Sequence, residues 1–303
     1  MGWTVFGKIP REGDFVRHEL RDPIAMECFR WVADSVSQQP SWVRAIPSHG
    51  VRFVFASPSA ADRVLIGVLV RSADRVGREF PLVALRAASA TDVGRSFPAI
   101  PLAWGAALGS VRRTLVERTV HDSITAIAGA LAEIAAPGAA ELRDAHTRAL
   151  HALQLAPAGD FHERVFGDGD AAPHYAYHTA RVAAAQVGRA QGPALLCPVT
   201  LASDTTAWLE LLRRLVPAID RPLGCVWTSG AEARLVVCLS DVPTAALHAV
   251  VGCPTESARI WPLSTASVAA RAKARALIEP LLPVTASAPL VAMIDALTQR
   301  SPA

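Results

Sequence analysis

Apolar residues recur along this chain at two spacings, one typical of β-strands and the other of α-helices. Short apolar or alternating runs predict strands, whereas apolar positions three and four residues apart predict one buried helix face. Asp22-Pro23 is a strong helix start, because Asp caps free amides and Pro fits the first helical position. The expected strands of the first half are 3–9, 51–55, 64–70 and 80–86, and the expected helices follow Asp22, Pro101, Ser123 and Gly138.

The second half shows the same alternation after a segment rich in Gly, Asp and Pro. That segment, 156–173, has the composition of a linker. It separates an N-terminal α/β region at 1–155 from a C-terminal α/β region at 174–303, which either stands alone or packs into the same domain. The expected elements of the C-terminal region are a strand at 194–199, a hairpin of strands 223–228 and 234–239, and helices at 205–215, 244–251, 267–282 and 287–299.

This alternation of strands and helices predicts the fold class. Sheets and helices that follow one another bury their apolar faces best in layers. We therefore expect an α/β protein, a layered α/β/α sandwich in which helices flank a mixed sheet. The apolar fraction of 51% and the charged fraction of 19% in 303 residues are compatible with a sizeable core.

Charge and cysteine usage narrow the classes of partner and compartment. The net charge is +3, and the basic residues, of which only Lys8 and Lys273 are lysines, are mixed with acids along the chain. Nucleic-acid binding needs a concentrated basic patch, so we expect no nucleic-acid partner. The five cysteines are widely spaced without a CxxC pair, which predicts neither a zinc site nor a disulfide framework. The chain shows no signal-peptide pattern and no uncharged apolar run of about 18 residues, so a cytoplasmic protein without membrane insertion is expected.

The common catalytic motifs are absent from the sequence. It contains no GxGxxG after a strand, no GxxxxGK[ST], no GxSxG and no HExxH. His174 and His178 lie four residues apart, and with Asp168 or Asp170 they could hold a metal for a hydrolase. A polar segment entering an amphipathic helix explains the same pattern. We assign no catalytic, cofactor-binding or metal-binding residue, and we keep the metal-assisted hydrolase as an alternative.

Two polar clusters stand out in an otherwise apolar chain. The first is Gly13-Asp14-Phe15 with Arg17, and the second is the turn from Arg71 to Glu79, which contains Asp74, Arg75 and Arg78. Paired Asp and Arg side chains are common structural elements of turns. Exposed turn residues also form partner surfaces, and the second turn could equally line an anion-binding sensor site. The residue chemistry leaves these roles open.

Taken together, the two clusters resemble the TagF family of type VI secretion-associated proteins. GKIPREGDFVRHEL is similar to the family opening GKLPxxGDFxxR, and GVLVRSADRVGREFPL is similar to its second signature, GxxxPSxDxxGRxFPL. GCVWTSG resembles a later segment, SLWWxxG, with one of its two tryptophans. The residues that carry the resemblance or belong to its turns are Gly7, Lys8, Pro10, Gly13, Asp14, Phe15, Arg17, Ser72, Asp74, Arg75, Gly77, Arg78, Phe80, Pro81, Trp227 and Gly230.

The resemblance implies a function that the residue chemistry alone does not. TagF-like proteins are non-enzymatic, cytoplasmic accessory proteins of the bacterial type VI secretion system with an α/β sandwich fold. They act after translation as negative regulators of its assembly, in association with a forkhead-associated-domain scaffold and the control of assembly by threonine phosphorylation. The resemblance implies no cofactor, and it leaves the signature residues either structural or partner-binding.

Overall fold

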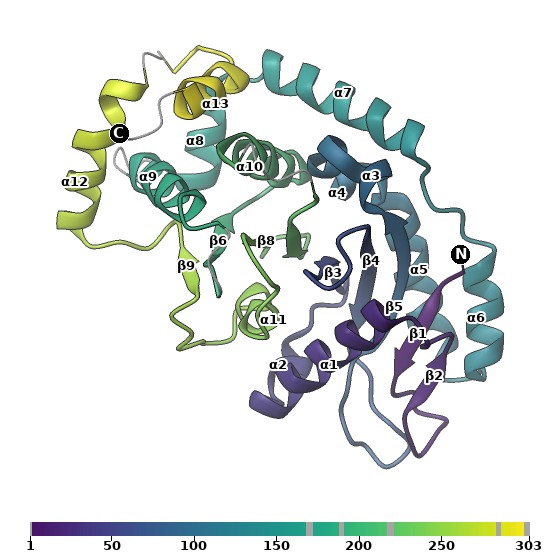
Figure 1. The fold of residues 1–303 in the computed structure, drawn as a ribbon. Coiled ribbons are helices and arrows are strands. Elements are labelled where there is room, and N and C mark those ends of the chain that lie inside the picture. The colour runs from purple at the N-terminus through teal and green to yellow at the C-terminus, as the bar shows by residue number, and fades with distance from the viewer. Residues whose placement is uncertain (1, 168–171, 188–190, 217–220, 283–285, 300–303) are drawn as a thin grey trace.

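The computed structural model describes residues 2–167, 172–187, 191–216, 221–282 and 286–299 (Figure 1). Their strands form one sheet in the order β2-β1-β5-β4-β3-β7-β8-β6-β9. Only the β6–β9 pair is parallel among the pairs of this sheet, so the sheet is mixed, as the sequence predicted. The strands are β1 (Thr4–Gly7), β2 (Val16–His18), β3 (Val51–Ala56), β4 (Arg63–Val70), β5 (Leu82–Ser89), β6 (Ala194–Pro198), β7 (Gly224–Trp227), β8 (Arg234–Cys238) and β9 (Ile260–Pro262).

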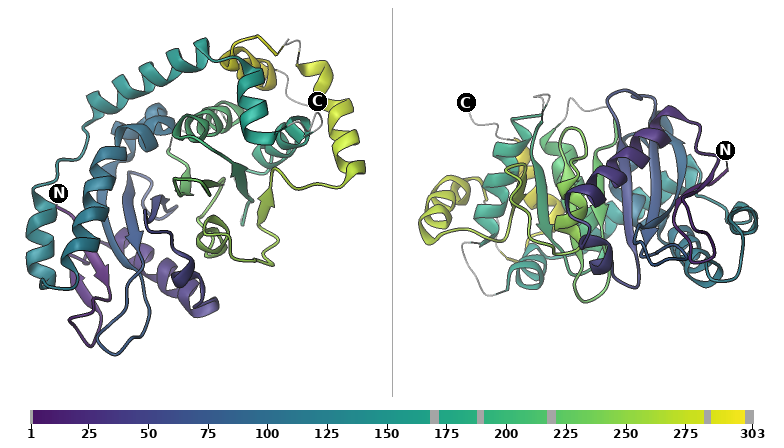
Figure 2. Two further views of the ribbon diagram at one scale, coloured as in Figure 1. Left: turned by 180° about the vertical axis from the view of Figure 1, so that it is seen from behind. Right: turned by 90° about the horizontal axis from the view of Figure 1, so that it is seen from below.

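Helices cover both faces of this sheet, as the views from behind and from below show (Figure 2). One face lies against α1, α2 and α11, and the other lies against the longer series that runs along the outer edge of the molecule (Figure 1). The helices are α1 (Pro23–Gln38), α2 (Trp42–Ala45), α3 (Ala90–Val93), η1 (Gly94–Ala99), α4 (Ile100–Ala103), α5 (Gly105–Arg118), α6 (Ile124–Ala132), α7 (Ala139–Leu155), α8 (Ala158–Phe166), α9 (Ala172–Ala184), α10 (Ala202–Leu215), α11 (Ala245–Val250), α12 (Val268–Ile278), η2 (Glu279–Leu281) and α13 (Leu290–Gln299).

The central strand β3 shows why the sheet needs two helical layers. Phe53 points to the face covered by α1 and α2, and Val54 points to the opposite face. Each side chain is buried on its own side of the sheet. Successive side chains of a strand alternate between the two faces of a sheet. A strand with apolar residues at both odd and even positions must therefore be covered on both faces. The same strand joins the halves of the chain, because Arg52 lies opposite Trp227 and Val54 lies opposite Cys225 of β7.

Local sequence signals placed several elements correctly. The Asp22 side chain accepts a hydrogen bond from the Ile24 amide and caps α1, with Pro23 at its first position. The predicted hairpin is confirmed as β7 and β8, which pair from Trp227 opposite Leu235 to Gly224 opposite Cys238. These elements depend on signals a few residues apart, which a single sequence carries in full.

The expected linker is wrong over part of its length. Residues 158–166 form α8, and Phe161 of this helix is buried against Trp208 with ring centroids 6.0 Å apart. Residues 168–171 lie outside the described residues. Gly159 and Asp160 look like loop residues in sequence, but the apolar face of α8 packs into the core. The division at 1–155 and 174–303 stays a prediction, with strands from both sides paired in one sheet.

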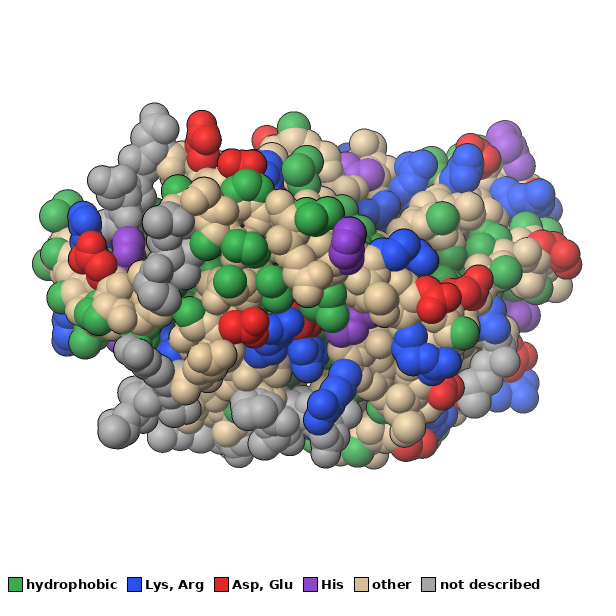
Figure 3. Space-filling view, turned by 90° about the horizontal axis from the view of Figure 1, so that it is seen from above, with side chains coloured by type: hydrophobic (Ala, Val, Ile, Leu, Met, Phe, Trp, Pro, Cys, Tyr) green, Lys and Arg blue, Asp and Glu red, His purple; other side chains and the backbone are tan. Residues whose placement is uncertain are grey.

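Charged side chains are dispersed over the outer helical face. On the face in Figure 3, the described Lys and Arg side chains lie among Asp and Glu side chains, with apolar side chains between them. In the described ranges, the helices are all too short or too polar to cross a membrane.

Candidate functional site

The two signature turns, which lie about 60 residues apart in sequence, meet in space. The Arg75 amide donates to the Glu12 carbonyl at 2.8 Å, and Arg78 Nη2 donates to the Gly13 carbonyl at 2.5 Å. The Ser72 hydroxyl donates to the Lys8 carbonyl at 2.6 Å. The segments 8–15 and 71–80 therefore form one unit, which we call the double turn.

Asp74 lies at the centre of the double turn, and its side chain is 0% exposed. Its Oδ2 accepts from Lys8 Nζ at 2.9 Å and from Arg78 Nε at 2.7 Å. Its Oδ1 accepts from the amides of Val76 at 3.1 Å and Arg78 at 2.9 Å. Both carboxylate oxygens are thus satisfied by donors from both turns, which is how a buried charge is made tolerable.

These contacts also fix the protonation state of Asp74. Burial raises the pKa of its carboxyl, but the hydrogen bonds from Lys8 and Arg78 outweigh burial and hold the pKa well below its usual range. The carboxylate therefore remains ionised at neutral pH. Its position in the network suits a structural anchor, since a general acid or base needs a pKa near the working pH.

Gly7, which directly precedes the double turn, and Gly77 within it have positive φ angles for different reasons. Gly7 has φ +137°, and an added Cβ would overlap the Pro81 carbonyl oxygen and lie 2.8 Å from Leu82 Cα. Gly77 has φ +84°, and an added Cβ would meet nothing within 4 Å. Close packing of β1 against the start of β5 requires Gly at position 7, whereas only the backbone conformation favours Gly at position 77.

The outer part of the double turn is exposed. Phe15 is 37% exposed, although its ring lies 4.8 Å from that of Phe80 and 5.1 Å from Lys8 Nζ. The neighbouring Arg17 guanidinium lies 5.2 Å from the Phe29 ring. We call the exposed side chains of this region the signature face: Asp14, Phe15, Arg17, Arg75, Val76 and Arg78.

The cations next to Asp74 bear on the anion-sensor alternative. Lys8 and Arg78 both contact the Asp74 carboxylate, and the Arg78 side chain is 61% exposed. An anion at this turn would have to compete with that internal carboxylate. The arrangement favours the structural use of Asp74, Lys8 and Ser72, and it leaves Arg75 and the outer part of Arg78 available to a partner.

The third resemblance segment lies away from the double turn. Trp227 is buried within the sheet opposite Arg52, and Gly230 has φ +93° in the β7–β8 turn. An added Cβ at Gly230 would lie 3.3 Å from His49 Cε1, so this turn packs against the loop before β3. Both residues are explained by the hairpin and its packing.

The histidines of the metal-site alternative lie on α9. Burial lowers the pKa of His178, and the charges of Lys273 and Arg181 lower it further, so its surroundings are cationic. Within the described ranges, the structure brings together no group of three or more metal-ligating side chains. Asp168 and Asp170 lie outside the described residues. Nearby, His162 Nε2 contacts the buried Tyr177 hydroxyl at 2.7 Å, and burial followed by the His174 charge lowers the His162 pKa to about 4.

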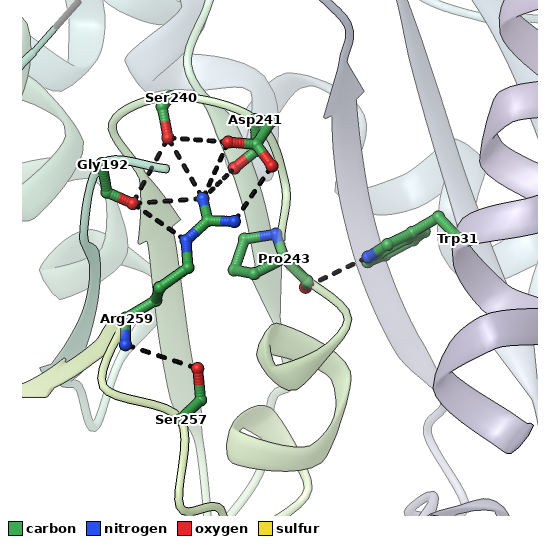
Figure 4. Close-up of polar contacts among 7 residues, drawn as sticks. All are labelled: Trp31, Gly192, Ser240, Asp241, Pro243, Ser257 and Arg259. Atoms are coloured by element: carbon green, nitrogen blue, oxygen red, sulfur yellow. Dashed lines mark hydrogen bonds and ion pairs between the residues drawn. The ribbon is translucent and has the colours of Figure 1, made fainter. Parts of the chain in front are cut away.

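A cleft of about 810 Å³ lies between α1 and the loops around α11, and no pattern in the sequence predicts it. The Trp31 indole donates to the Pro243 carbonyl at 3.1 Å and links its two walls (Figure 4). On the opposite wall the Arg259 guanidinium donates to both carboxylate oxygens of Asp241 and to the Gly192 carbonyl. The Arg259–Asp241 ion pair and the hydrogen bonds to Gly192 stabilise the loops around these three residues.

The geometry thus defines a mixed-sheet α/β protein with an internally anchored double turn beside an exposed face. Residues 4–133 match the TagF N-terminal domain, a Type VI secretion system-associated family, and both signature turns fall inside that match. Over these residues the chain is therefore similar to the TagF N-terminal domain. No protein with a curated description matches the chain.

One solved structure is similar in part. The crystal structure of PA0076 from Pseudomonas aeruginosa PAO1 is 19% identical to this chain, covering 86% of this chain and 99% of its own, with a TM-score of 0.47. A similarity at that score does not establish a shared fold.

Proposed function

We propose that this chain is a cytoplasmic, non-enzymatic accessory protein of the type VI secretion system that restrains assembly of the apparatus by binding another protein. The observation that carries the proposal is the TagF N-terminal match over 4–133, which includes both halves of the double turn. The forkhead-associated-domain scaffold is the partner that the family resemblance implies. This partner, the inhibitory direction and the cytoplasmic location are parts of the proposal.

The signature face is the surface that we propose for docking. Its backbone is held by the Asp74 network, so the exposed side chains are presented with little freedom. Aromatic residues, Phe among them, and Arg are enriched in protein–protein interfaces relative to the rest of the surface. Phe15 and Arg75 provide one of each, and an anchored turn avoids part of the ordering cost of binding.

Binding to a purified forkhead-associated-domain scaffold tests this proposal directly. We expect Phe15→Ala and Arg75→Glu each to weaken binding by at least ~10-fold, since truncation of a central residue typically costs more than about 1 kcal/mol. Val268→Ala and Arg113→Glu are the matched controls, because both residues are exposed on helices far along the chain from the double turn. Far-UV circular dichroism and Tm verify that the variants fold.

A secretion measurement tests the inhibitory direction separately. Deletion of the gene should increase release of type VI effectors, and the Phe15→Ala variant should restore inhibition less well than the wild type. Undetectable binding of the wild-type chain to the scaffold, together with unchanged effector release on deletion, would contradict the proposal.

A further inference from the structure

Three cationic or potentially cationic side chains converge where the N-terminal half meets the β7–β8 hairpin. His49 comes from the loop before β3, Arg52 from β3 itself and Arg112 from α5. Ser229 of the hairpin turn completes the group. We call these four residues the cationic cluster, which shares no residue with the double turn.

Hydrogen bonds and close packing hold the members of this cluster together. Arg52 Nη1 donates to the Ser229 hydroxyl at 3.3 Å, and Arg112 Nη1 donates to the Ser48 carbonyl at 3.0 Å. A Cβ added at Gly50 would lie 3.5 Å from Arg112 Cγ, and one added at Gly230 would lie 3.3 Å from His49 Cε1. The cluster therefore joins β3, α5 and the hairpin in one small volume.

No acidic side chain balances these groups among the residues that the structure describes. Arg52 Nε and His49 Nε2 are buried, and neither has a hydrogen-bond partner among the described residues. A buried donor without a partner normally costs free energy, and native proteins rarely retain one without a reason. Two such atoms beside a second arginine indicate a site that is completed by something else.

Burial and the neighbouring positive charges both lower the pKa values of Arg52 and His49. Burial lowers the pKa of Arg52, and the nearby charge of Arg112 lowers it further. Burial also lowers the pKa of His49, with further contributions from Arg52 and then Arg112. A bound anion would reverse this mutual repulsion, supply acceptors to the orphaned nitrogens and favour protonation of His49.

We propose that the cationic cluster binds a phosphate group, either as inorganic phosphate or as a phosphomonoester. Guanidinium groups present planar pairs of donors that match phosphate oxygens, and two of them offset the charge of about −2 that a phosphomonoester carries. The Ser229 hydroxyl adds a donor from the hairpin. The ligand would thereby bridge the β3–β7 contact between the two halves of the sheet. This site does not depend on the proposed function.

Thermal unfolding of the full chain in titrations of inorganic phosphate, phosphoserine and sodium acetate tests the site. All solutions are matched in ionic strength with chloride. A ligand that binds only the folded state raises Tm in a saturable way. We expect the Tm increase to saturate with inorganic phosphate or phosphoserine, and acetate to change Tm little. A stronger response to inorganic phosphate would identify free phosphate as the ligand, and a stronger response to phosphoserine would identify a phosphomonoester.

Substitutions separate this site from general salt effects. Arg52→Gln and Arg112→Gln should each weaken the phosphate response by at least ~10-fold, while Arg113→Gln, at the exposed next position of α5, should leave it unchanged. If Arg52→Gln does not fold, Arg112→Gln and Ser229→Ala still carry the test. An NMR titration of the His49 ring adds a local readout, with its pKa expected to rise when phosphate is present.

The outcomes are decisive in both directions. A Tm increase that chloride or acetate reproduces at equal ionic strength, or one that Arg112→Gln and Arg113→Gln share equally, would overturn the phosphate site. An unshifted His49 resonance at saturating phosphate would also overturn it. A lost phosphate response with intact scaffold binding would leave the proposed function standing.

Discussion

The double turn and the cationic cluster place charge in the fold in opposite ways. In the double turn, Lys8 and Arg78 share the carboxylate of Asp74, and two backbone amides complete its hydrogen bonds. In the cationic cluster, Arg52 and Arg112 lie near each other and near His49 with no described carboxylate between them. Both groups join segments that are distant in sequence, but within the described residues only the cationic cluster leaves buried side-chain nitrogens, Arg52 Nε and His49 Nε2, without a hydrogen-bond partner.

The difference indicates how a charged group can be assigned a role from its own chemistry. A network that satisfies its buried charges needs nothing from outside, so its value to the protein is the geometry it maintains. A group of like charges with buried donors left open is unfavourable for stability by itself. Its retention points to a ligand, whereas the signature face presents a surface that is already ordered. The two regions therefore predict different responses to neutralisation.

The largest expected effect is that of Asp74→Ala. The change removes the acceptor for Lys8 and Arg78 and for two backbone amides, so a buried cation is left without its partner. We expect it to lower Tm more than any other substitution considered for these regions. Asp14→Ala is the control, since Asp14 is an exposed aspartate of the same double turn. Equal losses of Tm for the two variants would contradict a central role for Asp74.

The dependence of Tm on acid pH also tests the contribution of Asp74 to stability. Because the pKa of Asp74 is lower in the folded state than its unfolded value of about 3.9, its contribution to stability is present above that value and is lost as the pH falls through the folded pKa. Glu210 behaves in the same way: burial raises its pKa, but Arg213 and His146 lower it to about 2 overall. We expect Tm to fall below about pH 4 in the wild type, and less steeply in Asp74→Asn. A Tm profile recorded from pH 7 to 2 measures both slopes.

A pair of glycine substitutions tests the packing around the anchored charge. Gly7→Ala should destabilise the chain by about 1–3 kcal/mol or more, because a positive φ and a clash with the Pro81 carbonyl coincide there. Gly77→Ala should cost only about 1–2 kcal/mol, the price of a left-handed conformation in open space. Urea unfolding gives both values. A larger loss at Gly77 would show that the outer turn, and not the β1–β5 contact, limits stability.

The sequence predicted the double turn better than the cationic cluster, for a physical reason. Asp74, Arg75 and Arg78 are close in sequence, so their polar turn was visible, although the contact of Lys8 with Asp74 across 66 residues was not. The cationic cluster draws on positions 49, 52, 112 and 229. Its defining property is that no acidic side chain of the described residues balances it, which depends on the tertiary fold, so no local pattern could reveal it.

The same distinction explains which parts of the fold were predicted. Asp22-Pro23 and the β7–β8 hairpin are specified by neighbouring residues, and both were found. The three-residue strand β2 is ordered by pairing with β1, and α8 is ordered by burial of Phe161 against α10. Such elements owe their existence to partners elsewhere in the chain, which override the local Gly and Asp signals.

The smallest expected effect, and the most discriminating, is that of Arg52→Met. Methionine keeps an unbranched apolar stem while removing a charge that faces Arg112, so in chloride buffer the free energy of unfolding should stay unchanged or rise by up to about 1 kcal/mol. Added salt should reduce this gain, because salt screens partly exposed charges. In phosphate the order should reverse, since only the wild type gains stability from the ligand. Urea unfolding in the two buffers measures the crossover. A loss in chloride as large as that of Asp74→Ala would mean that Arg52 supports the fold directly, and the contrast between the two regions would fail.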